Sequence, residues 1–175
     1  ALAANGAVTL HRRRDLDLPS FLCRIVVGQQ LSVRAARTIW GRVVQQAGDS
    51  PLGVHLATAA IAELRQCGMS QNKAKTIQSI VQADREGGLH EQSLAKLDHA
   101  TRSRQLTEIW GIGPWSADMV GIFYFADPDI WPENDVTVGK MLRRLTHSRR
   151  QPVRTAARFA PYRSYLAVHM WKIAD

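Results

Sequence analysis

The chain contains 175 residues, 45% of them hydrophobic, which is enough to bury a core in one domain or in two small helical lobes. No apolar run approaches the roughly 18 residues that span a bilayer. Residues 1–8 lack the basic and apolar regions of a signal peptide. Because the chain begins without Met, part of the N-terminus is expected to have been processed or left out. The formal net charge is +8. The two cysteines, Cys23 and Cys67, are too few for a cysteine-ligated zinc or iron–sulfur cluster. Both are expected to be reduced thiols in the core.

Helical spacing of apolar residues predicts most of the secondary structure. A first helix is expected over about residues 21–27 and a second over 33–44, capped by Ser32 and separated from the first by a turn at 28–30. After a loop at 48–53, further helices are expected at 58–67, capped by Thr58, and at 70–84, capped by Ser70. A short turn at 94–98, helices at 103–109 and 115–125, a rigid loop at 127–132, a helix from about Asp135 and a last helix at 162–173 complete the chain. Because no strand pattern is present, the predicted fold class is all α.

The positive charge is concentrated at the C-terminal end of the chain. Residues 1–135 balance, whereas the remainder carries one acid, Asp175, against the following basic residues: Lys140, Arg143, Arg144, Arg149, Arg150, Arg154, Arg158, Arg163 and Lys172. A positive region beside a neutral one favours a polyanionic partner. The alternative, a solvated surface in an arginine-rich chain, does not explain why the first three quarters are neutral.

The most informative segment is Leu106 to Ala117, LTEIWGIGPWSA. Gly111 and Gly113 permit a tight turn whose N–H groups face the start of the next helix, an arrangement suited to holding a phosphate. An aspartate, Asp135, follows about twenty residues later within Glu133-Asn134-Asp135-Val136. A carboxylate at that distance is more than a phosphate clamp needs, so the pair indicates chemistry on nucleic acid.

Four blocks of the sequence, residues 25–32, 106–118, 131–135 and 162–171, resemble the helix-hairpin-helix DNA glycosylases with a Gly/Pro-rich loop and a catalytic Asp. Within them the chain is similar to the monofunctional 3-methyladenine DNA glycosylase II group. The resemblance implies two helical lobes around a cleft, a central one of about residues 30–130 and a second one of 1–29 with 131–175. It also implies excision of alkylated bases from duplex DNA.

Several DNA-binding roles follow from this resemblance. Gly111 and Gly113 would present backbone N–H groups to a phosphate, and the hydroxyl of Ser116 would add to that contact. In similar proteins carbonyls of the hairpin also hold a monovalent cation, Na⁺ or K⁺. The residues that correspond to these carbonyls are Thr107, Ile109 and Ile112, and the residues expected to meet further phosphates are Lys140, Arg143 and Arg144. No other cofactor is expected.

Asp135 is the expected catalytic residue. Cleavage of an N-glycosidic bond develops positive charge on the deoxyribose, which a carboxylate stabilises while it orients or deprotonates the attacking water. One acid suffices because an N-alkylated base is already cationic. Asp135 also suits the N-cap of the following helix, a role compatible with catalysis. Asn134 stands where the family commonly has a second acid, so the local charge is less negative.

Three side chains are expected to line the pocket for the flipped base. Trp115 and Trp171 would place indole faces against a cationic purine, worth about 0.5–2 kcal/mol, and Met119 stands where a relative carries Tyr. Core packing is the alternative role for either Trp. Family members that cleave the strand carry a Schiff-base lysine where this chain has Trp115, so hydrolysis by water is expected.

The turn between the first two helices is expected to fill the gap left by the flipped nucleotide. Gln30 is the positional match to the wedge residue and Leu31 is its apolar neighbour. The alternative is an ordinary polar turn.

The sequence therefore predicts a monofunctional DNA glycosylase that binds damaged double-stranded DNA as a monomer, in the bacterial nucleoid or, in a eukaryote, in the nucleus. Three alternatives remain open. A non-catalytic DNA-binding or lesion-sensing module would not need Asp135 or the two Trp residues, a bifunctional glycosylase/lyase would need a lysine, and a protein-interaction domain would show no salt-dependent affinity for DNA.

Overall fold

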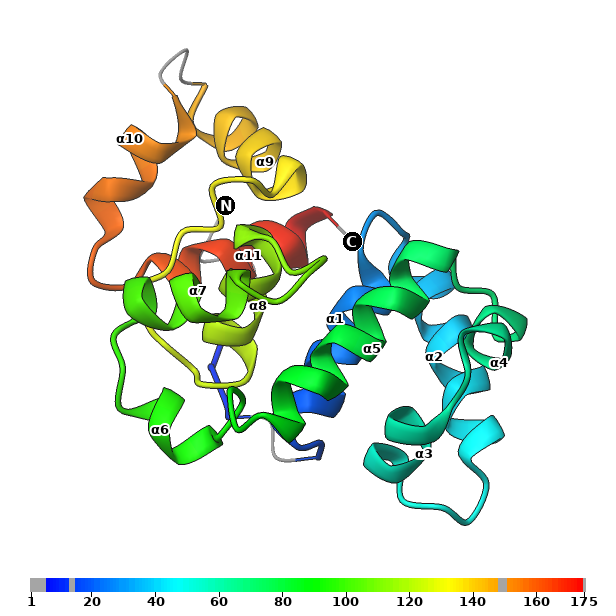
Figure 1. Cartoon of the computed structure of the whole chain (residues 1–175). Coiled ribbons are helices and arrows are strands. Elements are labelled where there is room, and N and C mark those ends of the chain that lie inside the picture. Colours follow the sequence, from blue (N-terminus) through cyan, green and yellow to red (C-terminus); the bar gives the residue numbers. More distant parts are fainter. Residues whose placement is uncertain (1–5, 13–14, 148–150, 175) are drawn as a thin grey trace. The chain divides into compact units, whose positions relative to one another are not determined.

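The computed structural model describes residues 6–12, 15–147 and 151–174, and over these residues the regular structure is helical, with no strand (Figure 1). The predicted all-α class is confirmed. The helices are α1 (Leu18–Gly28), α2 (Val33–Ala47), α3 (Leu52–Thr58), α4 (Ile61–Gln66), α5 (Gln71–Arg85), α6 (Glu91–Ala95), α7 (His99–Thr107), α8 (Pro114–Phe123), α9 (Val136–Thr146), α10 (Pro152–Ala156), the 3₁₀ helix η2 (Ala157–Phe159) and α11 (Arg163–Ala174). Within the described ranges, none of these helices has the length and apolar character needed to cross a membrane.

The chain separates into two compact units. Unit 1 comprises the described residues of Ala1–Arg13 and Ala117–Asp175, and unit 2 those of Arg14–Ser116. These bounds differ from the lobes expected from the sequence, 30–130 and 1–29 with 131–175. Helix α1 belongs to unit 2 because it packs against α5 and α2, and the greater part of α8 belongs to unit 1.

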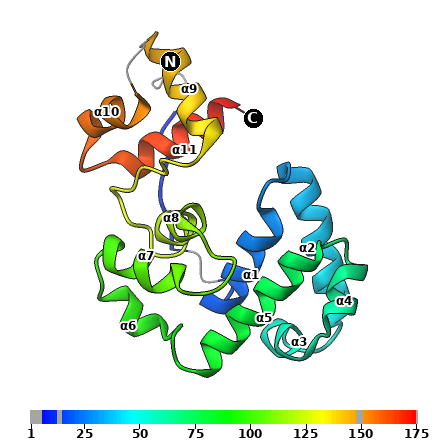
Figure 2. The same cartoon turned by 45° about the horizontal axis from the view of Figure 1, so that its top comes forward.

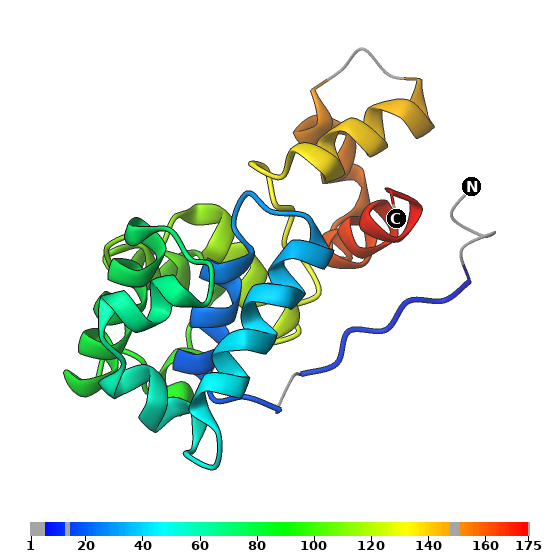
Figure 3. The ribbon, with the colours of Figure 1, turned by 90° about the vertical axis from the view of Figure 1, so that its right-hand side faces the viewer.

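Unit 2 is built around α1 and α5, which lie side by side (Figures 1 and 3). Leu22 and Val26 of α1, like Ile77 and Ile80 of α5, are fully buried. The predicted serine caps are confirmed, since Ser32 Oγ accepts from Ala35 N–H at 3.2 Å and Ser70 Oγ from Lys73 N–H at 3.3 Å. The two thiols are free and buried as expected, and burial raises the pKa of Cys23 and Cys67.

The prediction of one helix over residues 58–67 is wrong. Thr58 is the last residue of α3, which begins at Leu52 inside the expected loop, and α4 begins at Ile61. The Thr58 hydroxyl donates backward to the carbonyl of Val54 at 3.0 Å instead of capping the next helix. At the start of α4, the Glu63 carboxylate accepts from the N–H of Ala60 at 2.7 Å. Thr hydroxyls make either kind of local bond, so the residue type alone did not decide between them.

Unit 1 contains α9, α10 and α11, which lie next to one another (Figure 2). Their packing encloses an apolar core. The buried members of this core are Trp131, Val138, Met141, Leu142, Ala156, Leu166, Ala167 and Met170. Helix α10 was not predicted, because five residues with one buried side chain, Ala156, present too short a periodic pattern. Its start is marked by Pro152 in the first helical turn.

Asp129 connects the loop before α9 to the first residue of α11. Arg163 Nε and Nη2 donate to the two carboxylate oxygens of Asp129 at 2.7 and 2.9 Å. Next to this pair, the buried Ser164 hydroxyl accepts from Ile130 N–H at 2.8 Å. The two contacts join residues 34 positions apart, so the loop that leads into α9 is held against α11. The hydrogen bond from Arg163 holds the pKa of Asp129 below its usual range.

We expect Asp129→Asn to lower the free energy of unfolding at neutral pH by up to about 1 kcal/mol, the usual value of a partly exposed ion pair. Because the folded-state pKa is depressed, this contribution is present above the ordinary pKa of an aspartate, about 3.9, and is lost as the pH falls through the folded value. Urea unfolding at pH 7 and near pH 3 measures it, with the exposed Glu133→Gln as control. A difference from the wild-type chain that is as large near pH 3 as at pH 7 would contradict the assignment.

Candidate DNA-binding and active-site residues

The glycine hairpin, residues 108–113, connects α7 to α8 and lies against α5. Gly111 has φ +84°, and a Cβ built there would overlap the side chain of Thr76 on α5. A Cβ at Gly113 would meet nothing within 4 Å. The two glycines therefore differ: Gly111 is required by backbone conformation and close packing, whereas Gly113 leaves open space beside the N-terminus of α8.

Ser116 does not offer the exposed hydroxyl that was expected for phosphate contact. Its side chain is 1% exposed and its Oγ accepts a hydrogen bond from Gln29 Nε2 at 3.0 Å. The hydroxyl thus has an internal partner on the turn between α1 and α2. A phosphate at this motif would therefore contact backbone N–H groups of the hairpin and of the first turn of α8.

The carbonyls expected to hold a cation lie at and after the end of α7. Thr107 is the last residue of that helix, where carbonyl groups lack intrahelical partners and the helix dipole is negative. The Ile109 carbonyl accepts from Ile112 N–H at 3.0 Å, which leaves its second lone pair. Backbone carbonyl oxygens of this kind are suitable ligands for a monovalent cation.

The wedge turn, residues 28–31, exposes the side chains of Gln30 and Leu31. Gln30 is exposed and has φ +56°, and Leu31 is 40% exposed. The turn is closed by hydrogen bonds from Gln29 N–H to Val26 O and from Leu31 N–H to Gly28 O, each 3.2 Å. Both predicted wedge residues thus stand on a hydrogen-bonded turn of unit 2, available to a partner.

Asp135 caps α9 and holds a second hydrogen bond as well. Its Oδ1 accepts from Val138 N–H at 2.9 Å, and its Oδ2 accepts from the indole Nε1–H of Trp171 at 3.2 Å. The carboxylate is half-buried, in the electropositive field of a helix N-terminus. Donors to both oxygens fix the orientation of the carboxylate.

The three predicted pocket side chains have different environments. Trp171 is half-buried and contacts the ring of Phe123, with centroids 5.5 Å apart and an interplanar angle of 37°. Trp115 is half-buried in unit 2, and Met119 is 4% exposed in unit 1. The bond from Trp171 to Asp135 was not foreseen from the sequence, which assigned that indole to stacking alone.

The predicted phosphate-binding cations are exposed on the helix that Asp135 caps. Lys140, Arg143 and Arg144 all lie on α9, and Arg143 and Arg144 lie about 12 Å along the axis from Asp135. Of the other C-terminal cations, Arg149 and Arg150 lie outside the described residues.

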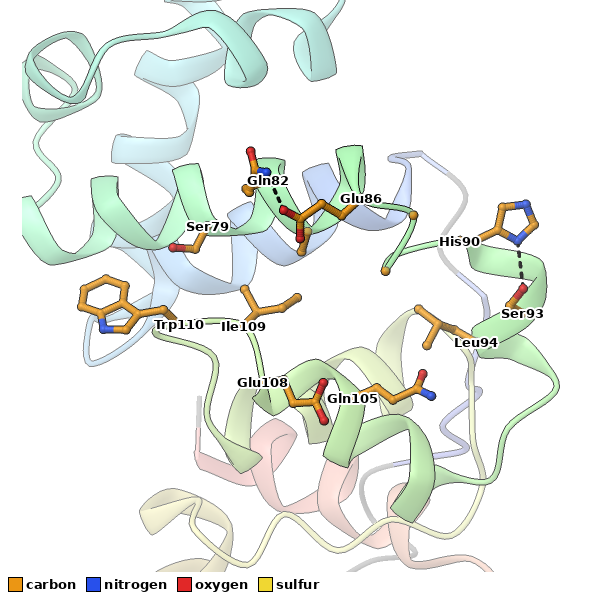
Figure 4. Close-up of a pocket in the computed structure, with 13 residues that line it drawn as sticks. Ser79, Gln82, Glu86, His90, Ser93, Leu94, Gln105, Glu108, Ile109 and Trp110 are labelled. Carbon is orange, nitrogen blue, oxygen red and sulfur yellow. Dashed lines mark hydrogen bonds between the residues drawn. The ribbon is translucent and has the colours of Figure 1, made fainter.

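A hollow of about 740 Å³ lies in unit 2 between α5, α6, α7 and residues 109–110 (Figure 4). Trp110, which is 53% exposed, stands at one end of it, and Glu86 and Glu108 come from different walls. Ile109, one of the predicted cation-binding carbonyls, is the one predicted site residue in its lining. The hollow is therefore bordered by residues 108–110 of the hairpin, and its lining does not include Gly111 or Gly113.

Sequence reasoning missed four residues that organise the site: Gln29, Lys73, Thr76 and Asp129. Each makes a contact with a residue more than thirty positions away. Local patterns carry no signal for such partners, although a lysine in an otherwise amphipathic helix and a glutamine in a turn do mark polar side chains that need partners.

Comparison with known proteins places these features in one family. The family model described as HhH-GPD superfamily base excision DNA repair protein matches residues 23–161. A Mycobacterium tuberculosis protein named "Probable bifunctional transcriptional activator/DNA repair enzyme AlkA" is 30% identical over 172 residues, covering 90% of this chain and 34% of its own length. The chain thus spans about a third of that relative.

Two solved structures are also similar. The DNA-3-methyladenine glycosidase of Bacillus halodurans has a TM-score of 0.80 and 28% identity, over 95% of this chain and 79% of its own. The 3-methyladenine DNA glycosylase of Schizosaccharomyces pombe, solved in complex with abasic DNA, has a TM-score of 0.84 at 24% identity, over 98% of this chain and 88% of its own. The latter shows the shared fold.

We expect Gly111→Ala and Gly113→Ala to differ in stability. An alanine at 111 combines a left-handed φ with overlap on Thr76 and should cost about 2 kcal/mol or more, whereas an alanine at 113 enters open space and should cost less than about 0.5 kcal/mol. Thermal or urea unfolding of the two variants measures this difference. Equal destabilisation would show that the hairpin does not rest on Thr76 as described.

Proposed function

Because the chain belongs to the HhH-GPD superfamily of base excision DNA repair proteins, we propose that it is a monofunctional DNA glycosylase acting on N-alkylated bases of the 3-methyladenine and 7-methylguanine type. The observation that carries the proposal is the Asp135 carboxylate, held at the N-terminus of α9 by one N–H donor to each oxygen. Such a group can stabilise cationic sugar character without itself needing to move.

The proposed partner is double-stranded DNA that contains a damaged base. The hairpin and the first turn of α8 would hold one phosphate through backbone N–H groups, and the open side of Gly113 leaves room for its approach. Exposed Lys140, Arg143 and Arg144 would meet further phosphates. One chain carries both the hairpin and the aspartate, so we propose that it acts as a monomer.

Base flipping would bring the damaged nucleotide out of the stack. Gln30 and Leu31, exposed on the wedge turn, would fill the space that it leaves, and the glutamine amide can hydrogen-bond the orphaned base. An indole face, that of Trp115 in unit 2 or that of Trp171 in unit 1, would attract a cationic purine more strongly than a neutral one. The buried Met119 side chain of unit 1 would contribute a polarisable sulfur with less stacking than an aromatic residue.

Hydrolysis then needs one water and no protonation of the leaving base. As the C1′–N bond breaks, its electron pair neutralises the positive alkylated base, and the water oxygen forms a bond to C1′. The Asp135 carboxylate stabilises the oxocarbenium-like sugar and orients the water, whose proton passes to the carboxylate or to solvent. The products are a free base and an abasic site.

A strand-cleaving route would require an amine that attacks C1′. The chain has Trp115 at the position where lyases of this superfamily carry their lysine, so no Schiff base forms there. A monovalent cation at the Thr107, Ile109 and Ile112 carbonyls would add positive charge beside the bound phosphate. The chemistry itself would remain that of Asp135.

We expect Asp135→Asn to retain DNA binding and to lose base release by at least about a hundredfold, because the carboxylate charge is removed. Asparagine is also a good N-cap, so α9 should keep its start. Release of free bases from methylated duplex DNA and a fluorescence binding assay measure the two properties, with Glu133→Gln as the matched control. An Asp135→Asn variant as active as the wild-type chain would disprove the mechanism.

We expect Trp171→Phe to lower the single-turnover rate of base release by roughly tenfold, because it keeps an aromatic face but removes the N–H donor to Asp135. Phe123→Leu is the paired control, since it removes the ring that packs on Trp171 and leaves the indole N–H in place. If Phe123→Leu slows the reaction as much as Trp171→Phe does, packing of the indole matters and its hydrogen bond does not.

A further inference from the structure

The wedge turn is anchored to α5 by a lysine. Lys73 Nζ donates to the carbonyls of Val27 and Gln29, each at 2.8 Å. Carbonyls at the C-terminus of a helix lack intrahelical partners and carry the negative end of the helix dipole, so an ammonium group there meets both needs. The lysine is partly buried, and this burial lowers its pKa. The end of α1 is thereby fixed to α5.

The glycine hairpin rests on the same face of α5. Thr76 lies three residues after Lys73, so the two side chains share one side of the helix. The Thr76 side chain occupies the space that a Cβ at Gly111 would need, and its own hydroxyl is satisfied by the carbonyl of Asn72 at 2.9 Å. One helix thus supports both elements that are proposed to contact DNA.

Gln29 joins the two elements directly. Its Nε2 donates to Ser116 Oγ at 3.0 Å and to the Gly111 carbonyl at 3.3 Å, across 87 and 82 positions of the sequence. The side chain therefore points toward the hairpin and α8, while the exposed Gln30 follows it on the turn. All of these residues belong to unit 2.

We propose that Gln29 is a positioning residue that couples the phosphate-binding hairpin to the wedge turn. A phosphate bound at the hairpin then fixes where Gln30 meets the duplex, because hairpin and turn move as one body on α5. This proposal rests on the proposed function. It assigns to the two adjacent glutamines separate tasks, with Gln30 entering the DNA and Gln29 holding the turn that presents it.

The experiment measures equilibrium affinity for two duplexes, one undamaged and one with a tetrahydrofuran abasic analogue, so that no chemistry is needed. Gln29→Met keeps the length of the side chain and removes its amide. We expect its affinity for the undamaged duplex and its melting temperature to stay near wild type. We expect its preference for the abasic analogue, which depends on insertion of the wedge, to fall by roughly tenfold.

Ser116→Ala removes the partner of Gln29 from the other side and should lower the same preference. Because Gln29→Met already removes the Gln29–Ser116 hydrogen bond that Ser116→Ala breaks, the double variant Gln29→Met/Ser116→Ala should lose no more preference than Gln29→Met alone. Unchanged preference in Gln29→Met, or losses that add in the double variant, would overturn the coupling while the wild-type preference still supports the proposed function. A wild-type chain with no preference for the abasic analogue would overturn both.

Discussion

Asp135 lies where the loop after α8 enters α9, and its carboxylate accepts one hydrogen bond from each of two elements. The Val138 N–H comes from the helix that the aspartate caps, and the Trp171 indole comes from α11. Because the two donors lie on different elements, the direction of the carboxylate is fixed. The proposed hydrolysis requires such a carboxylate to stabilise the positive charge on the sugar. A second acid is unnecessary because the leaving base is already cationic.

The rest of unit 1 maintains this geometry. Asp129 and Ser164 tie the loop before α9 to the start of α11, the helix that carries Trp171. The apolar core around Met170 and Leu142 packs α11 on α9. Helices α9 and α11 and the loop before α9 are therefore held together. This packing keeps the Trp171 indole beside the Asp135 carboxylate. A helix-capping aspartate acquires its second donor through this packing.

Unit 2 follows the same principle with different chemistry. There α5 supports both the wedge turn and the glycine hairpin, through Lys73 and Thr76 respectively. Both elements are short turns at helix ends, which by themselves are poorly fixed. The hydrogen bonds of Lys73 and the close packing of Thr76, both on one helix, give these turns a defined position. A loop that must meet a rigid partner such as duplex DNA needs support of this kind.

The sequence predicted those features that depend on near neighbours along the chain. The caps at Ser32, Ser70 and Asp135 follow from side-chain bonds to backbone groups three residues away, and the glycine turn follows from its residue types. The prediction that Thr58 caps a helix was wrong because a Thr hydroxyl can bond either forward to a backbone N–H or backward to a carbonyl, as it does here. Ser116 was assigned to phosphate on its place in the motif alone, and its partner Gln29 lies 87 positions away, beyond any local pattern.

The identity of the reaction products shows whether the bond is hydrolysed by water under the direction of Asp135. The chain should be incubated with methylated duplex DNA, with borohydride present in a parallel sample, and the DNA strand, the free bases and any protein–DNA adduct should be analysed. We expect free methylated purines, an abasic site in an uncleaved strand and no trapped adduct. Release of no base, or a covalent adduct accompanied by strand cleavage, would contradict water-mediated hydrolysis directed by Asp135.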